Sequence, residues 1–266
     1  MSEELLYVYA VLRTGPQLPR SLVEADTGPV LGAGLRLVGH DGLTAVAEPV
    51  SAADFDEGPL RARLEDLDWL AGVARAHHGV VARVGRLATT VPLRLATVCR
   101  GPEGVRRMLA EGRVPLTRAL RRLAGTEEWG VKLYTEPAAA DGPAASPAPS
   151  AAGGSGRDYL RTRVAARRAR DDRDDRARQT ARTLHDDLRA RASGAVTHPP
   201  QHGALSSAPG RNVLNAAYLV PTADRRAFLD GVPDADSLPA GLRIEVTGPW
   251  VPYSFAHGPA DAAEAP

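Results

Sequence analysis

The chain has 266 residues and a formal net charge of +1, and its 43% hydrophobic and 24% charged residues are typical of a soluble globular protein. The near-neutral charge argues against broad attraction to nucleic acid or anionic lipid, and no stretch approaches the roughly 18 uncharged apolar residues of a membrane span. A single cysteine, Cys99, excludes an internal disulfide, and the amino terminus lacks the basic region of a signal peptide, so we expect a cytoplasmic protein.

The first half of the chain predicts strands and helices mixed without strict alternation. The apolar, β-branched run "LLYVYAVL" is typical of a buried strand, and the Asp-Gly turn inside "GLRLVGHDGLTAVAEPV" predicts a hairpin. After a cap candidate in "SAADF", leucines three or four residues apart predict a helical stretch with one apolar face from about residue 59 to 86. "TTVPLRLATVC" predicts another strand, and "GPEGVRRMLAEG" begins a helical stretch for which Gly125 is a plausible end.

The second half begins with the strand-like segment "EEWGVKLYTE". Residues 137–156 are dense in Pro, Ala, Gly and Ser and predict a disordered loop. A charged helix is expected from about residue 158 to 192, followed by the strand "RNVLNAAYLVP", a short helix capped by Thr222 and the final strand "GLRIEVTGPW". Residues 258–266 predict a disordered tail. This order of elements indicates the α+β class. The long helix has a thin apolar stripe made of Leu160, Val164, Ala177, Ala181, Leu184 and Leu188.

The acidic cluster "DDRDD", Asp171–Asp175, is the one hint of an enzyme. Aspartates at this spacing could hold Mg²⁺ and a diphosphate, which would make the chain a metal-dependent diphosphate or nucleotide enzyme. However, residues 157–191 carry twelve arginines against seven aspartates, and such interleaved charges usually form a solvated helix face. The aspartates also argue against nucleic acid as the partner of this helix, because each repels phosphate.

Other reactive residues do not form a recognisable catalytic or cofactor-binding motif. His77 and His78 are adjacent, so their side chains project in different directions from a helix, and we expect them to lie at a helix end or on the surface. Cys99 follows an apolar strand near Arg94, which could lower its thiol pKa, although a buried structural cysteine is more common. We therefore predict no catalytic residue, no cofactor site and no metal site.

Three segments combine strand-like residues with specific polar or aromatic groups: "TTVPLRLATVC", "EEWGVKLY" and "TGPWVPYSF". Arg94 stands among apolar residues, so we expect a carboxylate such as Glu127 or Glu128, or backbone carbonyls, to hold its guanidinium. Trp129 and Trp250 offer large rigid surfaces. Both packing in a core and binding a partner remain open for these residues.

These segments, in this order, resemble the gas vesicle protein family GvpL/GvpF. The family's opening strand, its central P-L-R-F-G-T segment, its E-W-G-V-K segment and its terminal G-P-W-P-P-Y-S-F correspond here to "LYVYAVL", "VPLRLATVC", "EEWGVKLY" and "GPWVPYSF". The chain departs from the pattern at Leu95, Ala96 and Val251. The likeness extends from Leu5 to Phe255.

The resemblance implies two domains, an N-terminal α+β domain at residues 1–125 and a modified ferredoxin-like domain at 126–257 that contains the Pro/Ala-rich loop. It also implies a non-catalytic accessory or minor wall component of gas vesicles, which contacts the hydrophobic shell protein GvpA and other Gvp proteins, as a monomer. On this basis we expect "TGPWVPYSF" to close the sheet of the second domain and to present aromatic rings at its edge. The hypothetical partner-binding residues are Trp250, Tyr253, Phe255, Arg94 and Trp129.

Overall fold

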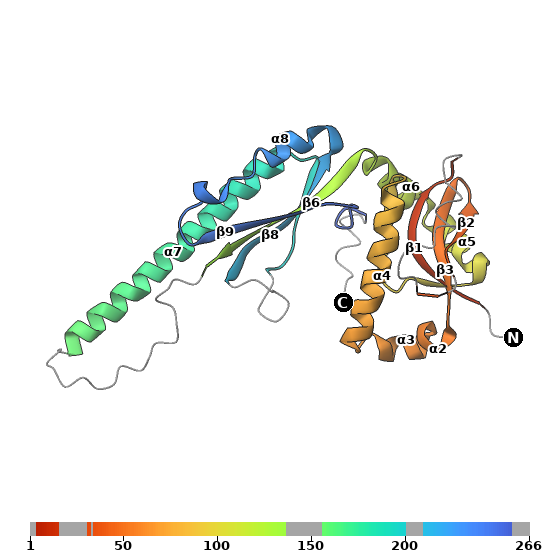
Figure 1. Cartoon of the computed structure of the whole chain (residues 1–266), viewed down its shortest axis with the longest axis horizontal. Helices are drawn as coiled ribbons and strands as arrows, with labels where there is room; N and C mark the ends of the chain where they lie inside the picture. Colours follow the sequence, from red (N-terminus) through yellow and green to blue (C-terminus); the bar gives the residue numbers. More distant parts are fainter. Residues whose placement is uncertain (1–3, 16–30, 33, 137–155, 201–209, 257–266) are drawn as a thin grey trace. The chain divides into compact units, whose positions relative to one another are not determined.

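A computed structural model of the chain describes residues 4–15, 31–32, 34–136, 156–200 and 210–256, with the side chains of 156–159 left out. The chain divides into two compact units. The first comprises residues 1–128 and 249–266, and the second comprises residues 129–248. Helices and strands are mixed in both units, as the α+β prediction requires (Figure 1). None of the described helices combines the length and the apolar character needed to cross a membrane.

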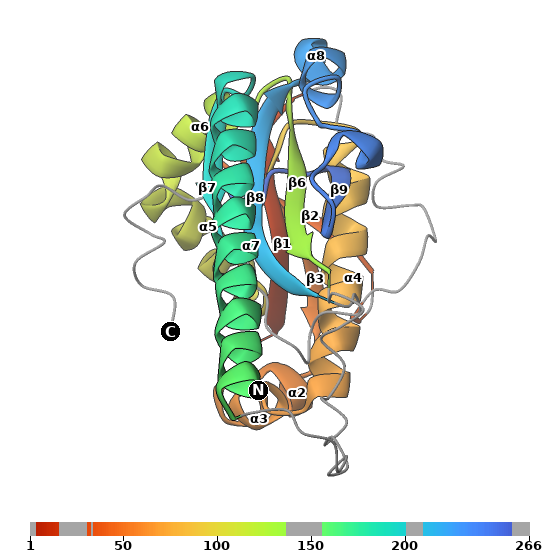
Figure 2. The same cartoon turned by 90° about the vertical axis from the view of Figure 1, so that its left-hand side faces the viewer.

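The first unit is built around β1 (Leu5–Arg13), whose residues up to Leu12 are all buried. It pairs with β3 (Leu43–Val50), and the sheet runs in the order β2-β3-β1-β4, with β5 also paired to β1. Helices cover both faces of this sheet, with α4 on one side and α5 and α6 on the other (Figures 1 and 2). Burial on both faces explains why β1 reads as a continuous apolar run rather than an alternating one.

The predicted hairpin is confirmed as β2 (Arg36–His40) and β3 joined by Asp41 and Gly42. Both turn residues have positive φ, 46° and 79°, which is the backbone that a two-residue hairpin turn needs. The carboxylate of Glu48, on β3, is completely buried. It accepts hydrogen bonds from the hydroxyl of Tyr9 and from the amides of residues 31, 32 and 34, so it holds that loop against the sheet.

The helical stretch predicted for residues 59–86 is found, but it is divided into two helices. Within "SAADF", Ser51 caps the short α2 (Ala52–Phe55), which is followed by α3 (Glu57–Arg63) and α4 (Leu67–Gly85). The break occurs at Asp66, whose side chain accepts hydrogen bonds from the amides of residues 68 and 69 and so begins a new helix. The leucine spacing continues through this break without marking it.

The segment "TTVPLRLATVC" also contains a break. It forms β4 (Thr90–Pro92) and β5 (Val98–Arg100), which both pair with β1 and are separated by a turn that includes Ala96 at a φ of 61°. Two helices follow, α5 (Gly101–Glu111) and α6 (Arg113–Arg122). The stretch ends at Gly125, whose φ is 68°, as expected for a residue that terminates a helical segment.

The second unit has a four-stranded sheet in the order β7-β8-β6-β9. Its strands are β6 (Thr126–Thr135), β7 (Gly194–Thr197), β8 (Arg211–Pro221) and β9 (Leu242–Trp250). The segments "EWGVKLY" and "RIEVTGPW", which form β6 and β9, are therefore neighbours in this sheet. The carboxy-terminal half of the long helix α7 (Gly156–Ala190) packs on this sheet through Ala181, Leu184 and Leu188.

Two details of the second unit differ from the sequence-based expectations. The apolar stripe of α7 is buried only from Ala177 onward, whereas Leu160 and Val164 are 61% and 50% exposed. Thr222 does not cap α8 (Arg225–Leu229), because the residue before that helix is Asp224 in a short 3₁₀ turn, and its side chain makes no cap hydrogen bond. The disorder predicted for 137–156 and 258–266 falls almost entirely outside the described residues.

The end of the chain belongs to the first unit. We call residues 250–256 the tail segment. Its Val251 and Tyr253 pack against the core of the first unit, which contains Tyr7 and Val84. The expected closing of the second sheet is met by β9, which ends at Trp250. The expectation that Tyr253 and Phe255 also lie at the edge of that sheet is wrong, since the residues after Trp250 belong to the first unit. The domain boundaries at 125 and 257 stay a prediction.

Candidate partner-docking site

Polar bonds at two adjacent residues, Ser254 and Phe255, fix the tail segment near its carboxy-terminal end. The amide and the hydroxyl of Ser254 each donate a hydrogen bond of 2.8 Å to the carboxylate of Glu128. The guanidinium of Arg122 donates to the carbonyl oxygen of Phe255, whose ring is buried. Burial raises the pKa of Glu128, and the two bonds from Ser254 oppose that rise because they favour the ionised form.

Beneath the tail segment lies a buried polar pair, Tyr7 and His77. The Tyr7 hydroxyl and the His77 Nδ1 are 2.9 Å apart, and the same hydroxyl accepts a hydrogen bond from the amide of Ala96. Burial raises the pKa of Tyr7 to about 12 and lowers the pKa of His77 to about 4, so both groups are neutral near pH 7. A neutral His77 can accept the Tyr7 proton through Nδ1, which ties α4 to β1.

Aromatic contacts connect this pair to the surface. The ring centroid of Tyr253 lies 6.3 Å from that of His77 and 6.1 Å from that of His78, which stacks on it. His78 also meets the ring of Trp250 edge-on at 5.4 Å. Trp250 is 43% exposed. The segment therefore presents one large, partly exposed ring whose neighbours are held by the core, which is the usual setting of an interface anchor.

Close packing supports the tail segment from α4 as well. A methyl group added at Gly85 would come within 2.3 Å of the side chain of Val251. Only a glycine allows the helix to approach so closely. By contrast, nothing lies within 4 Å of such a methyl group at Gly79 in the same helix.

The structure separates the five predicted site residues into three kinds. Phe255 and Trp129 are buried, at 7% and 8% exposure, in the cores of the first and second unit respectively. Tyr253 is half-buried against His77 and His78. Arg94 and Trp250 are exposed. Arg94 lies in the turn between β4 and β5, and its carbonyl accepts hydrogen bonds from the amide and hydroxyl of Thr97.

The sequence did not predict the buried position of His77, and it did not predict the bond between Glu128 and Ser254. His77 is 4% exposed in the middle of α4, so the expectation of a surface or helix-end histidine is wrong for it. A signal was present, because His77 follows Val73 by four residues and therefore lies on the apolar face of the helix. The Glu128–Ser254 bond joins residues 126 positions apart and leaves no local pattern.

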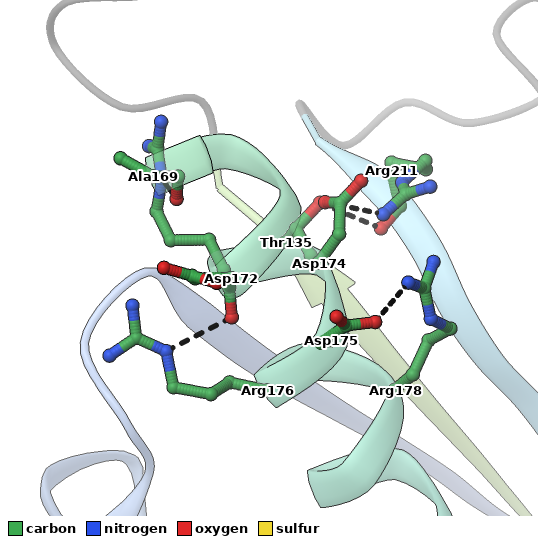
Figure 3. Close-up of polar contacts among 9 residues, drawn as sticks. Thr135, Ala169, Asp172, Asp174, Asp175, Arg176, Arg178 and Arg211 are labelled. Atoms are coloured by element: carbon green, nitrogen blue, oxygen red, sulfur yellow. Dashed lines mark hydrogen bonds and ion pairs between the residues drawn. The ribbon is translucent and has the colours of Figure 1, made fainter. Parts of the chain in front are cut away.

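The acidic cluster at Asp171–Asp175 forms ion pairs within its own unit (Figure 3). Asp174 pairs with Arg211 of β8 at 2.7 Å, and Asp175 pairs with Arg178 one turn further along α7. Among the described residues, no three His, Cys, Asp or Glu side chains come together in a way that could hold a metal ion. These pairs match the solvated helix face expected from the sequence and give no support to the metal-dependent alternative.

Cys99 lies half-buried on β5, and burial raises its thiol pKa. The lowered pKa that neighbouring arginines could have produced is therefore not found. A thiol that stays protonated is a poor nucleophile.

Comparison with known proteins places this arrangement in a family. Residues 5–257 match the family model described as gas vesicle synthesis protein GvpL/GvpF. Over 255 residues the chain is 51% identical to gas vesicle protein L of Streptomyces sp. (strain CB03234), covering 96% of this chain and 94% of that protein.

Solved structures of two GvpF proteins have a similar fold. GvpF from Anabaena sp. PCC7120 superposes with a TM-score of 0.65 at 18% identity, covering 96% of both chains. GvpF from Microcystis aeruginosa gives a TM-score of 0.62 at 18% identity, covering 95% of this chain and 99% of that one. The structures support the fold, and the family match over nearly the whole sequence decides the identity: the chain belongs to the gas vesicle synthesis protein family GvpL/GvpF.

Proposed function

We propose that this chain is a non-catalytic accessory or minor wall component in gas vesicle assembly, and that it contacts the hydrophobic shell protein GvpA and other Gvp proteins. Membership of the GvpL/GvpF family supports the assembly role. The proposal places the chain in the cytoplasm, at gas vesicles. A shell subunit with a strongly apolar face would aggregate before assembly unless another protein covered that face.

The observation that supports a docking role is the exposed Trp250 on an immobilised segment. The ring contacts His78 at 5.4 Å, and four positions further along the chain Ser254 is fixed by Glu128. A ring that is already ordered loses little conformational entropy when a partner covers it. We propose Trp250 as the main anchor for the shell protein. Tyr253 and Phe255 then act by positioning Trp250, because they pack inward.

We propose that Arg94, in the turn between β4 and β5, also belongs to the docking site. The turn that carries Arg94 is tied to Tyr7 through the Ala96 amide, and Leu95 in the same turn is 36% exposed. An exposed cation beside apolar side chains suits the rim of an interface, where charge selects the partner and steers its approach. Trp129, buried in the second unit, is proposed to support the fold and not to touch the partner.

The test is co-purification with the GvpA-type shell protein of the same organism, expressed together with the chain. The informative variant is Trp250→Ala, since deleting residues 248–255 would also remove Ser254 and the buried Phe255. Leu67→Ala is a matched control, because Leu67 is an even more exposed apolar residue, 77% exposed, at the first position of α4 and eleven positions before His78.

We expect Trp250→Ala to remain folded at the temperature of the experiment and to lose the shell protein, while Leu67→Ala retains it. Equal retention by Trp250→Ala and by the unaltered chain would disprove the anchoring role. If the unaltered, folded chain retained no shell protein, the proposal would have to turn to a different Gvp partner.

A further inference from the structure

The strand β9 lies at one end of the sheet of the second unit (Figure 2). It is the last member of the order β7-β8-β6-β9, so among the described residues no strand pairs with its outer edge. The chain on either side of it, residues 225–241 and 251–256, is described and forms no strand. The outer edge of this nine-residue strand therefore carries backbone amides and carbonyls that another strand can bond.

Two contacts in the second unit set which residues of β9 direct their backbone groups outward. The amide of Glu136 donates a hydrogen bond of 2.8 Å to the carbonyl oxygen of Gly241, and the guanidinium of Arg243 lies 4.4 Å from the centre of the Tyr134 ring. Both contacts fit one antiparallel register of β6 and β9, in which the backbone groups of Gly241 and Arg243 face β6. Because this direction alternates along a strand, outward-facing backbone groups belong to residues 242, 244 and 246.

The side chains of β9 alternate between the two faces of the sheet. Leu242, Ile244 and Val246 pack on the core that α7 covers, and each is only partly buried. Arg243 and Glu245 lie on the opposite face, with side chains 32% and 35% exposed. Their ion pair is 3.7 Å long, which is too long for a hydrogen bond, and the Nη2 atom of Arg243 has no hydrogen-bond partner among the described residues. Both charged groups therefore keep bonding capacity that a facing strand can use.

A second β9 strand complements the first when the two run antiparallel about a twofold axis at Ile244. Arg243 of each copy then lies opposite Glu245 of the other. These are non-hydrogen-bonded positions of the ladder, where facing side chains come closest. On the core side, Leu242 lies opposite Val246, so the apolar side chains match as well. Moving the axis by one residue places Arg243 opposite Arg243, or Glu245 opposite Glu245, and like charges at facing positions destabilise the pairing.

We infer that this protein forms a homodimer in which the β9 strands of two copies pair about Ile244 and join their sheets into one. A second copy is favoured over a strand of another protein, because β9 itself supplies both members of each matched pair. The dimer replaces the monomer expected from the family resemblance. Its interface lies in the second unit, whereas the proposed docking of the shell protein uses Trp250 of the first unit, so each proposal can fail without the other.

The experiment measures the mass and the dimer dissociation constant of the full chain by sedimentation equilibrium, up to about 100 μM. Arg243→Glu and Glu245→Arg each reverse one charge, so each variant places like charges opposite one another in a dimer with itself. A mixture of the two variants restores opposite charges at both facing positions. The matched controls are Arg226→Glu and Asp230→Arg, which reverse the charges of an exposed ion pair in the same unit.

We expect the unaltered chain and both controls to associate to twice the 28.1 kDa mass of one chain. Each β9 variant alone should dimerise about tenfold more weakly or worse, because attraction becomes repulsion at two facing positions. The mixture should regain dimers that contain one copy of each variant. An affinity tag on one variant identifies these mixed dimers, since it captures the untagged variant.

A chain that stays monomeric at every concentration would overturn the inference. So would dimers that both β9 variants form as well as the unaltered chain does, because another surface would then hold the copies together. Failure of the two variants to form mixed dimers would also overturn it. Circular dichroism checks folding, and Glu245→Gln replaces a reversed variant that does not fold and must still weaken the dimer. Loss of a Gvp protein from the β9 variants, with the mass of the chain unchanged, would assign β9 to that protein instead.

Discussion

Ser254 donates two hydrogen bonds of 2.8 Å to the buried carboxylate of Glu128, one from its amide and one from its hydroxyl. Two residues 126 positions apart thus hold the end of the chain in the first unit. The bonds also explain how a carboxylate with only 9% exposure is accommodated, because each lone pair used by Ser254 replaces a lost contact with water.

Removing this hydroxyl tests how firmly the tail segment is held. We expect Ser254→Ala to lower the free energy of unfolding by about 1–2 kcal/mol, since a hydrogen bond to a charged group is lost while the amide bond remains. Urea unfolding with Glu128→Ala and the double variant gives the coupling energy between the two residues. Ser237→Ala, at an exposed serine that bonds only a neighbouring carbonyl, should change little. Additive effects of the Ser254 and Glu128 changes would contradict the coupling.

The contact between α4 and the tail segment can be probed with two glycines. Gly85→Ala should destabilise the protein by about 1–3 kcal/mol, because the new methyl group would come within 2.3 Å of Val251 and displace it. Gly79→Ala should stabilise it by about 0.5–1 kcal/mol through helix propensity alone. Thermal melts of both variants provide the comparison. The same sign of effect at both positions would mean that the tail segment does not pack against Gly85.

His77 should make stability depend on pH in the mildly acidic range. Its pKa falls from an ordinary 6.5 to about 4 on folding, so between these values the unfolded chain binds more protons and acid favours unfolding. The stabilisation that comes from the neutral form of His77 is present in full above pH 6.5 and is lost as the pH falls toward 4. We expect a loss of about 2 kcal/mol between pH 7 and pH 5.

The variant that isolates this effect is His77→Gln, whose amide oxygen can still accept the proton of Tyr7. The measurement is the difference in free energy of unfolding between the two proteins as a function of pH. A difference is necessary because the pKa of Glu128 is raised on folding, which acts in the opposite direction as its carboxyl ionises. Parallel curves from pH 7 to pH 5 would show that His77 does not titrate as described.

Glu48 should be among the most sensitive positions in the first unit. Its carboxylate is the acceptor for Tyr9 at 2.5 Å and for the amide of Gly32 at 2.7 Å, as well as for two further amides. Glu48→Ala leaves all four donors without this acceptor, so we expect a loss of about 3 kcal/mol or more by urea unfolding. Tyr9→Phe removes one donor only and should cost about 1 kcal/mol. If Glu48→Ala lowered the free energy of unfolding by less than Tyr9→Phe does, Glu48 would not be the acceptor that holds residues 31, 32 and 34 to the sheet.

Some elements could be predicted because the sequence pattern that produces each of them lies within a few neighbouring residues. The strand at β1 and the Asp41-Gly42 hairpin follow from side-chain pattern and turn chemistry within a few residues. The break between α3 and α4 was not predicted, although its signal is also short. Asp66 precedes the helix that it caps, but Leu64 and Leu67 continue the leucine spacing while being exposed themselves, at 42% and 77%.

The sequence indicated which aromatic residues belong to the candidate site, but not which of them are exposed and which are buried. The family-like motif pointed to Trp250, Tyr253 and Phe255, yet it could not say that Phe255 is buried and Trp250 is not. Trp250 contacts His78, and Ser254 bonds Glu128. Both partners are distant in sequence, and these contacts form in place of a longer β9. Such tertiary contacts override the local preference of a strand-like segment.

The first unit consists of two stretches of chain separated by the whole second unit. A ribosome therefore releases residues 129–248 before it releases Ser254 and Phe255, so the second unit can fold while the first still lacks its last piece. During that interval Tyr7 and His77 lack their covering ring, and Glu128 lacks both of its donors. Completion of the first unit is thus a late event in synthesis, and a chain that stops short of Phe255 leaves an unfinished core.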